Sequence, residues 1–378
     1  MKSMTDTLTL EQYQEMALAT DQNRTPGMRG AKFPMLGLFG EVGSLMAEVK
    51  KKQRDGLARG NFREAVLEEF GDALWYFSNL ASRAGTSLGY LEVLHSRDSS
   101  AQAGSGDGVW TGTAGLDAFE DRVINLAAAV GALVSEFASE KGAAEPAELA
   151  KHLPEIFAAL VKVARCGEID MREVAKLNLS KTRDRWPGPN AEPTPLFDLG
   201  FEEDEQLPRD IKMLYLEKHV GDKSYVIQKC NGIRIGDRLT DNMTEDDGYR
   251  FHDIFHLAFA AVLGWSPVTR ALFRCKRKSN PVIDEVEDGA RAIVIEEGVS
   301  TWVFNQASRH KCFEGLSTLD YDLLKRIRNL VKGFEVERCA LWEWERAILK
   351  GYEVFRMVRR NGGGLVHADL LQRKISVE

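Results

Sequence analysis

Residues 40–56 read GEVGSLMAEVKKKQRDG, and residues 61–85 read NFREAVLEEFGDALWYFSNLASRAG. Apolar residues recur in both stretches at three- and four-residue intervals, which is the spacing of one face of an α-helix. Gly56 and Gly60 interrupt the pattern between them, and glycine is unfavourable inside helices. We therefore expect two long antiparallel helices joined by a short turn.

The ends of these two helices can also be predicted. Pro34 would be tolerated in a first turn, so the first helix is expected to run from about this residue to Lys52. Asn61 followed by Glu64 matches a capping box that would open the second helix, which is expected to end near Arg83.

The acidic residues of each helix share one stripe, because residues i, i+3, i+4 and i+7 lie on the same helical face. The stripes consist of Glu41, Ser44 and Glu48 in the first helix and Glu69, Asp72, Tyr76 and Asn79 in the second. Carboxylates among apolar neighbours are costly to bury unless they are paired or bind a metal ion. Mg²⁺ prefers oxygen ligands, so the facing stripes predict a magnesium site. The alternative is that both stripes are solvated acidic faces.

Length and composition limit the classes of protein to consider. With 378 residues and a net charge of −7, the chain is long enough for two domains and lacks the basic balance of a nucleic-acid-binding surface. Its five cysteines include no CxxC pair, which argues against a thiolate zinc site or a disulfide framework. The N-terminus lacks the apolar core of a signal peptide, and no apolar run approaches the ~20 residues of a membrane helix. We expect a cytoplasmic protein that binds neither membranes nor nucleic acid.

The rest of the chain divides into a helical half and a mixed half. Residues 97–116 are rich in glycine and serine and are expected to form a loop. Hydrophobic periodicity predicts further helices at residues 9–21, 117–140, 146–165, 169–183, 247–263, 284–308, 319–332 and 335–360. Strands are expected at residues 212–219, 223–230 and 232–239, with residues 373–378 returning to the sheet.

A stretch with five prolines and an acidic run, residues 186–209, separates the two halves. We therefore expect an all-α bundle at residues 1–188, a linker at residues 189–209, and an α+β domain at residues 210–378. The second domain is expected to be mostly helical with a small antiparallel sheet. The predicted fold class is mainly α.

The two acidic motifs resemble the ExxE…ExxD signature of the MazG-like, all-α nucleoside triphosphate pyrophosphatases. The residues from Asn178 to Pro187 are similar to the closing segment of that family, and the resemblance covers about residues 30–187. It implies that Mg²⁺, with Mn²⁺ as a substitute, is held around a nucleoside triphosphate by carboxylates of adjacent helices. It also implies release of a nucleoside monophosphate and pyrophosphate, in nucleotide-pool control or a stress or phage response, and assembly as a homo-oligomer.

Carried over residue by residue, the resemblance assigns Glu41 to the first glutamate of ExxE and Glu69 and Asp72 to ExxD. These three are the expected catalytic residues and metal ligands. The resemblance also implies that Lys181 and Arg185, in the closing segment, contact the substrate. The helical stripes add Ser44, which follows Glu41, and Tyr76 and Asn79, which share the stripe of Asp72, as further expected contacts.

One position departs from the family pattern. Ser44 stands where the family has the second glutamate of ExxE, and a hydroxyl supplies no charge. Glu48, one turn later on the same stripe, is an expected further metal ligand, and Glu68 is another residue that could compensate. The alternative function is a catalytically inactive nucleotide-binding sensor.

A second candidate site lies in the predicted C-terminal domain. His252 and His256 are four residues apart, so they face the same way on a helix at a spacing typical of metal ligands. With Asp253 and Glu297 they form a candidate metal site, and a second metal-dependent phosphohydrolase is a further alternative function. A hydrogen-bonded pair of core histidines is the structural alternative. This half of the chain is similar to a C-terminal extension of some MazG-like proteins.

Overall fold

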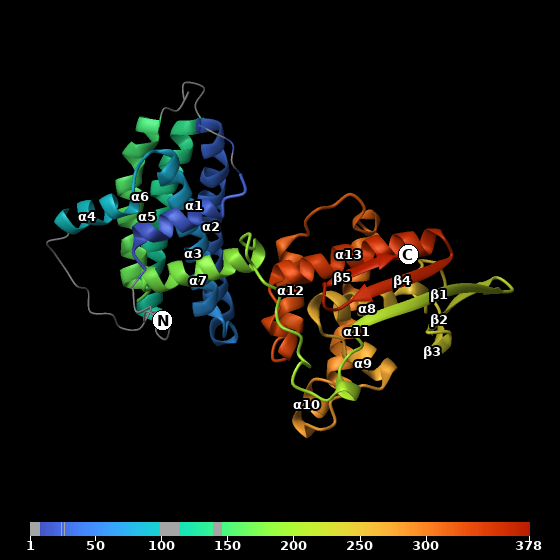
Figure 1. Ribbon diagram of the computed structural model, residues 1–378. Coiled ribbons are helices and arrows are strands. Elements are labelled where there is room, and N and C mark those ends of the chain that lie inside the picture. Colours follow the sequence, from blue (N-terminus) through green and yellow to red (C-terminus); the bar gives the residue numbers. More distant parts are fainter. Residues whose placement is uncertain (1–7, 24, 26, 99–112, 139–145) are drawn as a thin grey trace. The chain divides into compact units, whose positions relative to one another are not determined.

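The computed structural model describes residues 8–23, 25, 27–98, 113–138 and 146–378. The chain divides into two compact units, Met1–Trp186 and Pro187–Glu378. Figure 1 shows the first from blue to green and the second from yellow-green to red. The architecture is mainly helical with one small antiparallel sheet, which confirms the predicted fold class. None of the described helices is long and apolar enough to cross a membrane.

The N-terminal unit is a helical bundle around one hydrophobic core. Its helices are α1 (Leu10–Ala19), α2 (Gly27–Asp55), α3 (Phe62–Arg83), α4 (Leu88–Asp98), α5 (Thr113–Ala138), α6 (Pro146–Cys166) and α7 (Met171–Arg185). Helices α2 and α3 pack side by side (Figure 1), and a short turn that includes the 3₁₀ helix Gly56–Ala58 joins them. The expected pair of long antiparallel helices is therefore present.

Some helix ends differ from those expected. Helix α2 begins at Gly27, so Pro34 lies inside the helix and removes one internal hydrogen bond. Asn61 does precede α3, but its side chain makes no capping hydrogen bond, so the predicted capping box does not form. The sequence did not predict α4, and most of the expected loop at residues 97–116 lies outside the described residues.

The C-terminal unit contains a five-stranded antiparallel sheet in the order β3-β2-β1-β4-β5. The strands are β1 (Asp210–Val220), β2 (Lys223–Cys230), β3 (Ile233–Leu239), β4 (Gly363–Asp369) and β5 (Lys374–Val377). Alternate residues of β1, namely Ile211, Met213 and Tyr215, are buried, as expected where one face of a sheet packs on a core. The sequence predicted four of these strands and missed β4, which pairs with β1 and β5.

The helices of this unit are α8 (Asp253–Leu263), α9 (Pro267–Phe273), α10 (Pro281–Val286), α11 (Ala290–Ser308), α12 (Tyr321–Leu330) and α13 (Leu341–Arg360). Helices α8, α9 and α13 contact strands of the sheet, while α10, α11 and α12 pack on other helices. Helix α8 is buried from Ile254 to Leu263 and contacts β4, β5, α11 and α13. Gly289 separates α10 from α11, where one helix at residues 284–308 was expected. A Cβ at Gly289 would lie 2.0 Å from the carbonyl oxygen of Glu285, so this bend requires glycine.

The segment expected to be a linker folds largely with the C-terminal unit. Leu196, Phe197 and Leu207 are buried in its core. Asp198 is fully buried and accepts a hydrogen bond from Arg270 Nη2 at 2.7 Å. The prolines and acidic residues suggested a free linker, but the apolar residues among them have partners within the second unit.

Candidate functional site

Helices α2 and α3 bring three carboxylates together in the N-terminal unit. Glu41 of α2 and Glu69 and Asp72 of α3 each offer an oxygen atom, and these atoms lie within 4.8 Å of one another. All three side chains are partly exposed. We call Glu41, Glu69 and Asp72 the acidic cluster.

The electrostatics of the acidic cluster call for a cation. Burial, the charge of Asp72 and the hydrogen bond and charge of Glu69 raise the pKa of Glu41 from 4.5 to about 8, although Lys181 lowers it. Burial also raises the pKa of Glu69. Carboxylates this close cannot all ionise without a compensating charge. Three oxygen ligands in such a cluster fit Mg²⁺, which favours carboxylates and retains several waters.

Residues from α1 and α7 hold Asp72 in place. The amide of Asn178 donates to Asp72 Oδ1 at 2.9 Å, and the buried hydroxyl of Tyr13 donates to Asn178 Oδ1 at 3.0 Å. Lys181 forms an ion pair with Asp72 and another, at 3.0 Å, with Glu68. Sequence reasoning placed Asn178 only in the closing segment and missed Tyr13, because no local spacing marks a partner 165 positions away.

Glu48 lies on the expected helix, but its carboxylate forms ion pairs with two other residues. Its carboxylate is 2.6 Å from Lys51 Nζ and also pairs with Arg59. Burial alone would raise the pKa of Glu48, but the hydrogen bonds and charges of Lys51 and Arg59 lower it overall. The structure therefore does not bring Glu48 into the acidic cluster, and it leaves no nearby carboxylate on α2 to replace the missing charge at Ser44.

Tyr76 and Ser44 remain accessible, since both side chains are partly exposed, and Ser44 lies one turn after Glu41 on α2. Burial raises the pKa of Tyr76, with contributions from the charges of Glu41 and Asp72. Its ring lies against Gly37, where a Cβ would be only 2.2 Å from a ring carbon. Glycine at position 37 therefore lets this ring approach α2 closely.

Asn79 and Arg185, two of the expected substrate contacts, have little exposed surface. Asn79 is buried, and its amide donates to the carbonyl oxygen of Trp75 at 3.0 Å. Arg185 is also buried, with its guanidinium carbon 5.7 Å from the centre of the Trp186 ring. Spacing placed Asn79 on the acidic stripe, but packing of the bundle covers it.

A hollow of about 440 Å³ lies between α2 and α5. Its lining residues are Gly43, Met46, Ala47, Val49, Lys50, Gln53, Glu120, Val123 and Ile124. It includes no residue of the acidic cluster. The hollow therefore borders a different face of α2 from the one that carries Glu41.

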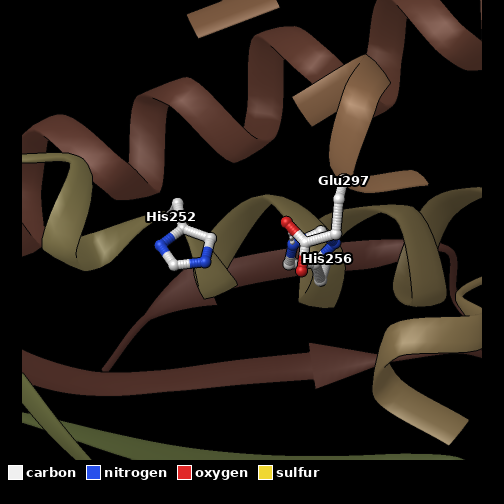
Figure 2. Close-up of side chains that lie close together, drawn as sticks. All are labelled: His252, His256 and Glu297. Atoms are coloured by element: carbon white, nitrogen blue, oxygen red, sulfur yellow. Dashed lines mark ion pairs between the residues drawn. The ribbon is translucent and has the colours of Figure 1, made fainter. Parts of the chain in front are cut away.

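A second cluster of ligand types lies in the C-terminal unit. His252 precedes α8, His256 lies within it, and Glu297 lies on α11; their ligand atoms are within 4.8 Å of one another. Figure 2 shows the Glu297 carboxylate over the His256 ring, and His256 Nε2 is 3.4 Å from Glu297 Oε2. Asp253 borders the group, with Oδ1 3.1 Å from His252 Nε2 and Oδ2 accepting from Gln228. We call His252, His256 and Glu297 the histidine cluster.

Comparisons with known proteins concern both the family and the fold. Residues 192–378 match the family described as the MazG C-terminal domain. The chain is 33% identical over 88 residues to the Gene 37 protein of Mycobacterium phage L5, a match that spans 21% of this chain and 77% of that protein. No solved structure matches significantly. On the basis of these similarities, the chain belongs to the MazG-like family.

Proposed function

We propose that the N-terminal unit is a Mg²⁺-dependent nucleoside triphosphate pyrophosphohydrolase that releases a nucleoside monophosphate and pyrophosphate. The convergence of Glu41, Glu69 and Asp72 from two adjacent helices is the main support. Membership in the MazG-like family favours the same activity. The resemblance of the acidic motifs to those of pyrophosphatases connects this carboxylate site with the activity expected from the family.

The acidic cluster would hold the metal ion, with Mn²⁺ as a substitute for Mg²⁺. Such an ion neutralises phosphate charge and activates water when it is bound. The chain itself orients Asp72 through Asn178 and places Lys181 beside the cluster, where an ammonium group can meet a phosphate.

Within this reaction, we assign Glu41 the role of accepting a proton from the attacking water. Burial and the neighbouring carboxylates raise its affinity for a proton, and a carboxylate that a bound cation keeps ionised can act as a general base. The water oxygen then bonds to the α-phosphorus, and the bond from that phosphorus to the oxygen bridging to the β-phosphate breaks. Pyrophosphate leaves with the electron pair of the broken bond.

One observation favours a second candidate function, a nucleotide-binding sensor without turnover. Ser44 lacks the charge expected at its position, and Glu48 is already paired with Lys51 and Arg59. The acidic cluster therefore has three carboxylates where the family pattern would supply four. Such a site could bind a metal–nucleotide complex and still fail to hydrolyse it.

Pyrophosphate release separates the two functions. We would incubate the full chain with each NTP and dNTP plus Mg²⁺ and compare Glu69→Gln with the matched control Glu64→Gln, an exposed carboxylate on the same helix. The enzyme proposal predicts release that Glu69→Gln abolishes and Glu64→Gln retains. Nucleotide binding without pyrophosphate release from any substrate would support the sensor and overturn the enzyme.

We also propose that the N-terminal unit assembles as a homo-oligomer through α2. Leu36 is 72% exposed and Phe39 is 50% exposed on this helix, and large exposed apolar side chains are typical of interaction surfaces. Light scattering during size-exclusion chromatography should show more than one chain per particle. Leu36→Glu should lower that mass, whereas an unchanged mass would place the interface elsewhere.

The proposed setting is the cytoplasm, where nucleoside triphosphates are available. There the activity would control the nucleotide pool, either by removing damaged nucleotides or by depleting nucleotides under stress or phage attack. Which nucleotide the panel identifies as the preferred substrate would distinguish these roles, since removal of damaged nucleotides requires a preference for a modified base.

A further inference from the structure

We propose that the histidine cluster binds one divalent transition-metal ion through Nε2 of His252, Nε2 of His256 and the carboxylate of Glu297. The site lies within the C-terminal unit and shares no residue with the acidic cluster. The proposal is therefore independent of the pyrophosphatase proposal.

Hydrogen bonds fix which nitrogen of each histidine faces the cluster. His252 Nδ1 is 2.9 Å from the backbone carbonyl oxygen of Tyr249, which can only accept a hydrogen bond. His256 Nδ1 is 2.8 Å from Glu296 Oε1. In both rings Nδ1 must carry the proton, so in the neutral form each Nε2 has a free lone pair. Metal-binding histidines are commonly held by an oxygen acceptor at the other ring nitrogen.

The free lone pairs face carboxylate oxygens. His252 Nε2 lies 3.1 Å from Asp253 Oδ1, and His256 Nε2 lies 3.4 Å from Glu297 Oε2. A nitrogen lone pair and a carboxylate oxygen at such distances repel each other unless a positive charge lies between them. For comparison, ligand atoms about 2.0–2.1 Å from a tetrahedral metal ion are about 3.4 Å apart.

A proton on each ring is the competing way to supply that charge. It would place two imidazolium groups next to each other, since the centres of the His252 and His256 rings are 5.7 Å apart. His256 is only 2% exposed, so water would screen this repulsion poorly. One divalent ion supplies the charge to both rings at once.

The residues behind the cluster keep its ligands in position. Glu296 is fully buried, and besides His256 it accepts hydrogen bonds from Ser266 Oγ at 2.6 Å and Val268 N at 2.8 Å. This carboxylate therefore cannot turn toward the metal and serves to orient His256. Tyr249 stacks on His252 with a centroid distance of 4.4 Å. The contacts that hold the two imidazoles therefore lie on the side of each ring that faces away from the cluster.

The donor set indicates the class of ion. Imidazole nitrogens with a carboxylate suit Zn²⁺, Co²⁺, Fe²⁺, Ni²⁺ or Mn²⁺, whereas Mg²⁺ prefers oxygen ligands alone. Three protein ligands leave a coordination position for water. The side chain of Glu297 is 40% exposed, so the ion can exchange with solvent on that side.

Cobalt binding tests the site in the full-length protein. The protein would be stripped with a chelator and titrated with Co²⁺ in the presence of excess Mg²⁺, which occupies the acidic cluster. We expect one Co²⁺ per chain and the visible absorption typical of nitrogen ligation. His252→Gln and Glu297→Gln should each weaken binding at least tenfold, while the control His219→Gln, an exposed histidine on β1, should leave it unchanged.

The outcomes are distinct even if one variant fails to fold. Circular dichroism would check each variant, and the partly exposed Glu297 provides a test that does not remove a buried ring. Absence of stoichiometric Co²⁺ binding in the wild type would overturn the proposal in favour of protonated histidines. Full cobalt binding in a folded Glu297→Gln variant would show that Glu297 is not a ligand.

Discussion

The acidic cluster and the histidine cluster arrange their negative charge in two different ways. In the acidic cluster, Glu41, Glu69 and Asp72 repel one another, and Lys181 is the cation beside them. In the histidine cluster, imidazoles lie between the carboxylates, and Glu296 fixes the orientation of His256. The first arrangement suits a metal ion that arrives with a charged substrate. The second suits a resident ion held by preorganised ligands.

The largest expected effect is a loss of function at one cluster that leaves the other cluster unchanged. Asp72→Asn removes a carboxylate ligand, and second-sphere changes alone cost roughly 10–100-fold in metal affinity or activity. We therefore expect pyrophosphate release to fall by more than about 100-fold, with Co²⁺ binding at the histidine cluster unchanged. His252→Gln should show the reverse, losing Co²⁺ and retaining pyrophosphate release.

Both measurements should be made on each variant of this pair. If Asp72→Asn weakened Co²⁺ binding, the two clusters would not be independent, or the Co²⁺ would be in the acidic cluster. If His252→Gln abolished pyrophosphate release while the protein stayed folded, the C-terminal unit would take part in catalysis.

A smaller effect is expected from restoring the missing charge of the acidic cluster. Ser44→Glu places a carboxylate on α2, one turn from Glu41, and so offers the acidic cluster a fourth carboxylate. Mg²⁺ binds carboxylate oxygens. We expect Mg²⁺ to be bound about tenfold more tightly, which corresponds to about 1.4 kcal/mol. The Mg²⁺ concentration that gives half-maximal pyrophosphate release measures this change.

Ser44→Gln is the matched control, because it adds a side chain of similar size without the charge. An equal gain in both variants would mean that size rather than charge is responsible. A gain of turnover in Ser44→Glu from a wild type without turnover would identify Ser44 as the reason for a sensor function.

The next effect in size is the pH dependence of the free energy of unfolding, to which the acidic cluster should contribute. Glu41 has a pKa of about 8 when the chain is folded and an ordinary value of 4.5. Between these values the folded chain holds more protons than the unfolded chain, so the free energy of unfolding falls as pH rises. Urea denaturation in the presence of a chelator should show this fall between about pH 5 and pH 8.

Glu41→Gln removes the titrating group and should flatten this part of the profile. The variant and the wild type should be similarly stable near the acid end of the window, with the variant the more stable at the alkaline end. Mg²⁺ should reduce the difference, because a cation replaces the proton. Parallel profiles for the two proteins would show that Glu41 does not carry the raised pKa.

The features that could be predicted from the sequence follow from local periodicity. The stripe positions of Glu41, Glu69 and Asp72 need only helical spacing and one antiparallel contact. Glu48 satisfied the same spacing, but its carboxylate forms an ion pair with Arg59, which lies beyond the end of α2. Periodicity cannot predict that outcome, because it depends on how the chain turns after the helix.

Neighbouring carboxylates show a second limit of sequence reasoning. Glu296 and Glu297 are adjacent on α11, yet Glu296 lies behind His256 and Glu297 lies beside its free nitrogen. The sequence predicted Glu297 as a ligand but gave no role to Glu296. The missed role depends on Ser266 and Val268, which follow α8 and lie 28–30 positions away in the chain.

Tyr13 was missed for the same reason, and its removal should have the smallest effect. Burial and the charge of Asp72 raise the pKa of Tyr13 well above its ordinary value, so its hydroxyl stays protonated and donates to Asn178. Tyr13→Phe leaves a buried amide oxygen without this donor, which costs about 1–3 kcal/mol. Asn178 keeps its bond to Asp72, so we expect less than a tenfold loss of pyrophosphate release. Tyr90→Phe, at an exposed tyrosine, should change neither denaturant stability nor activity; a Tyr13→Phe protein as stable as that control would mean that the hydroxyl does not support the cluster.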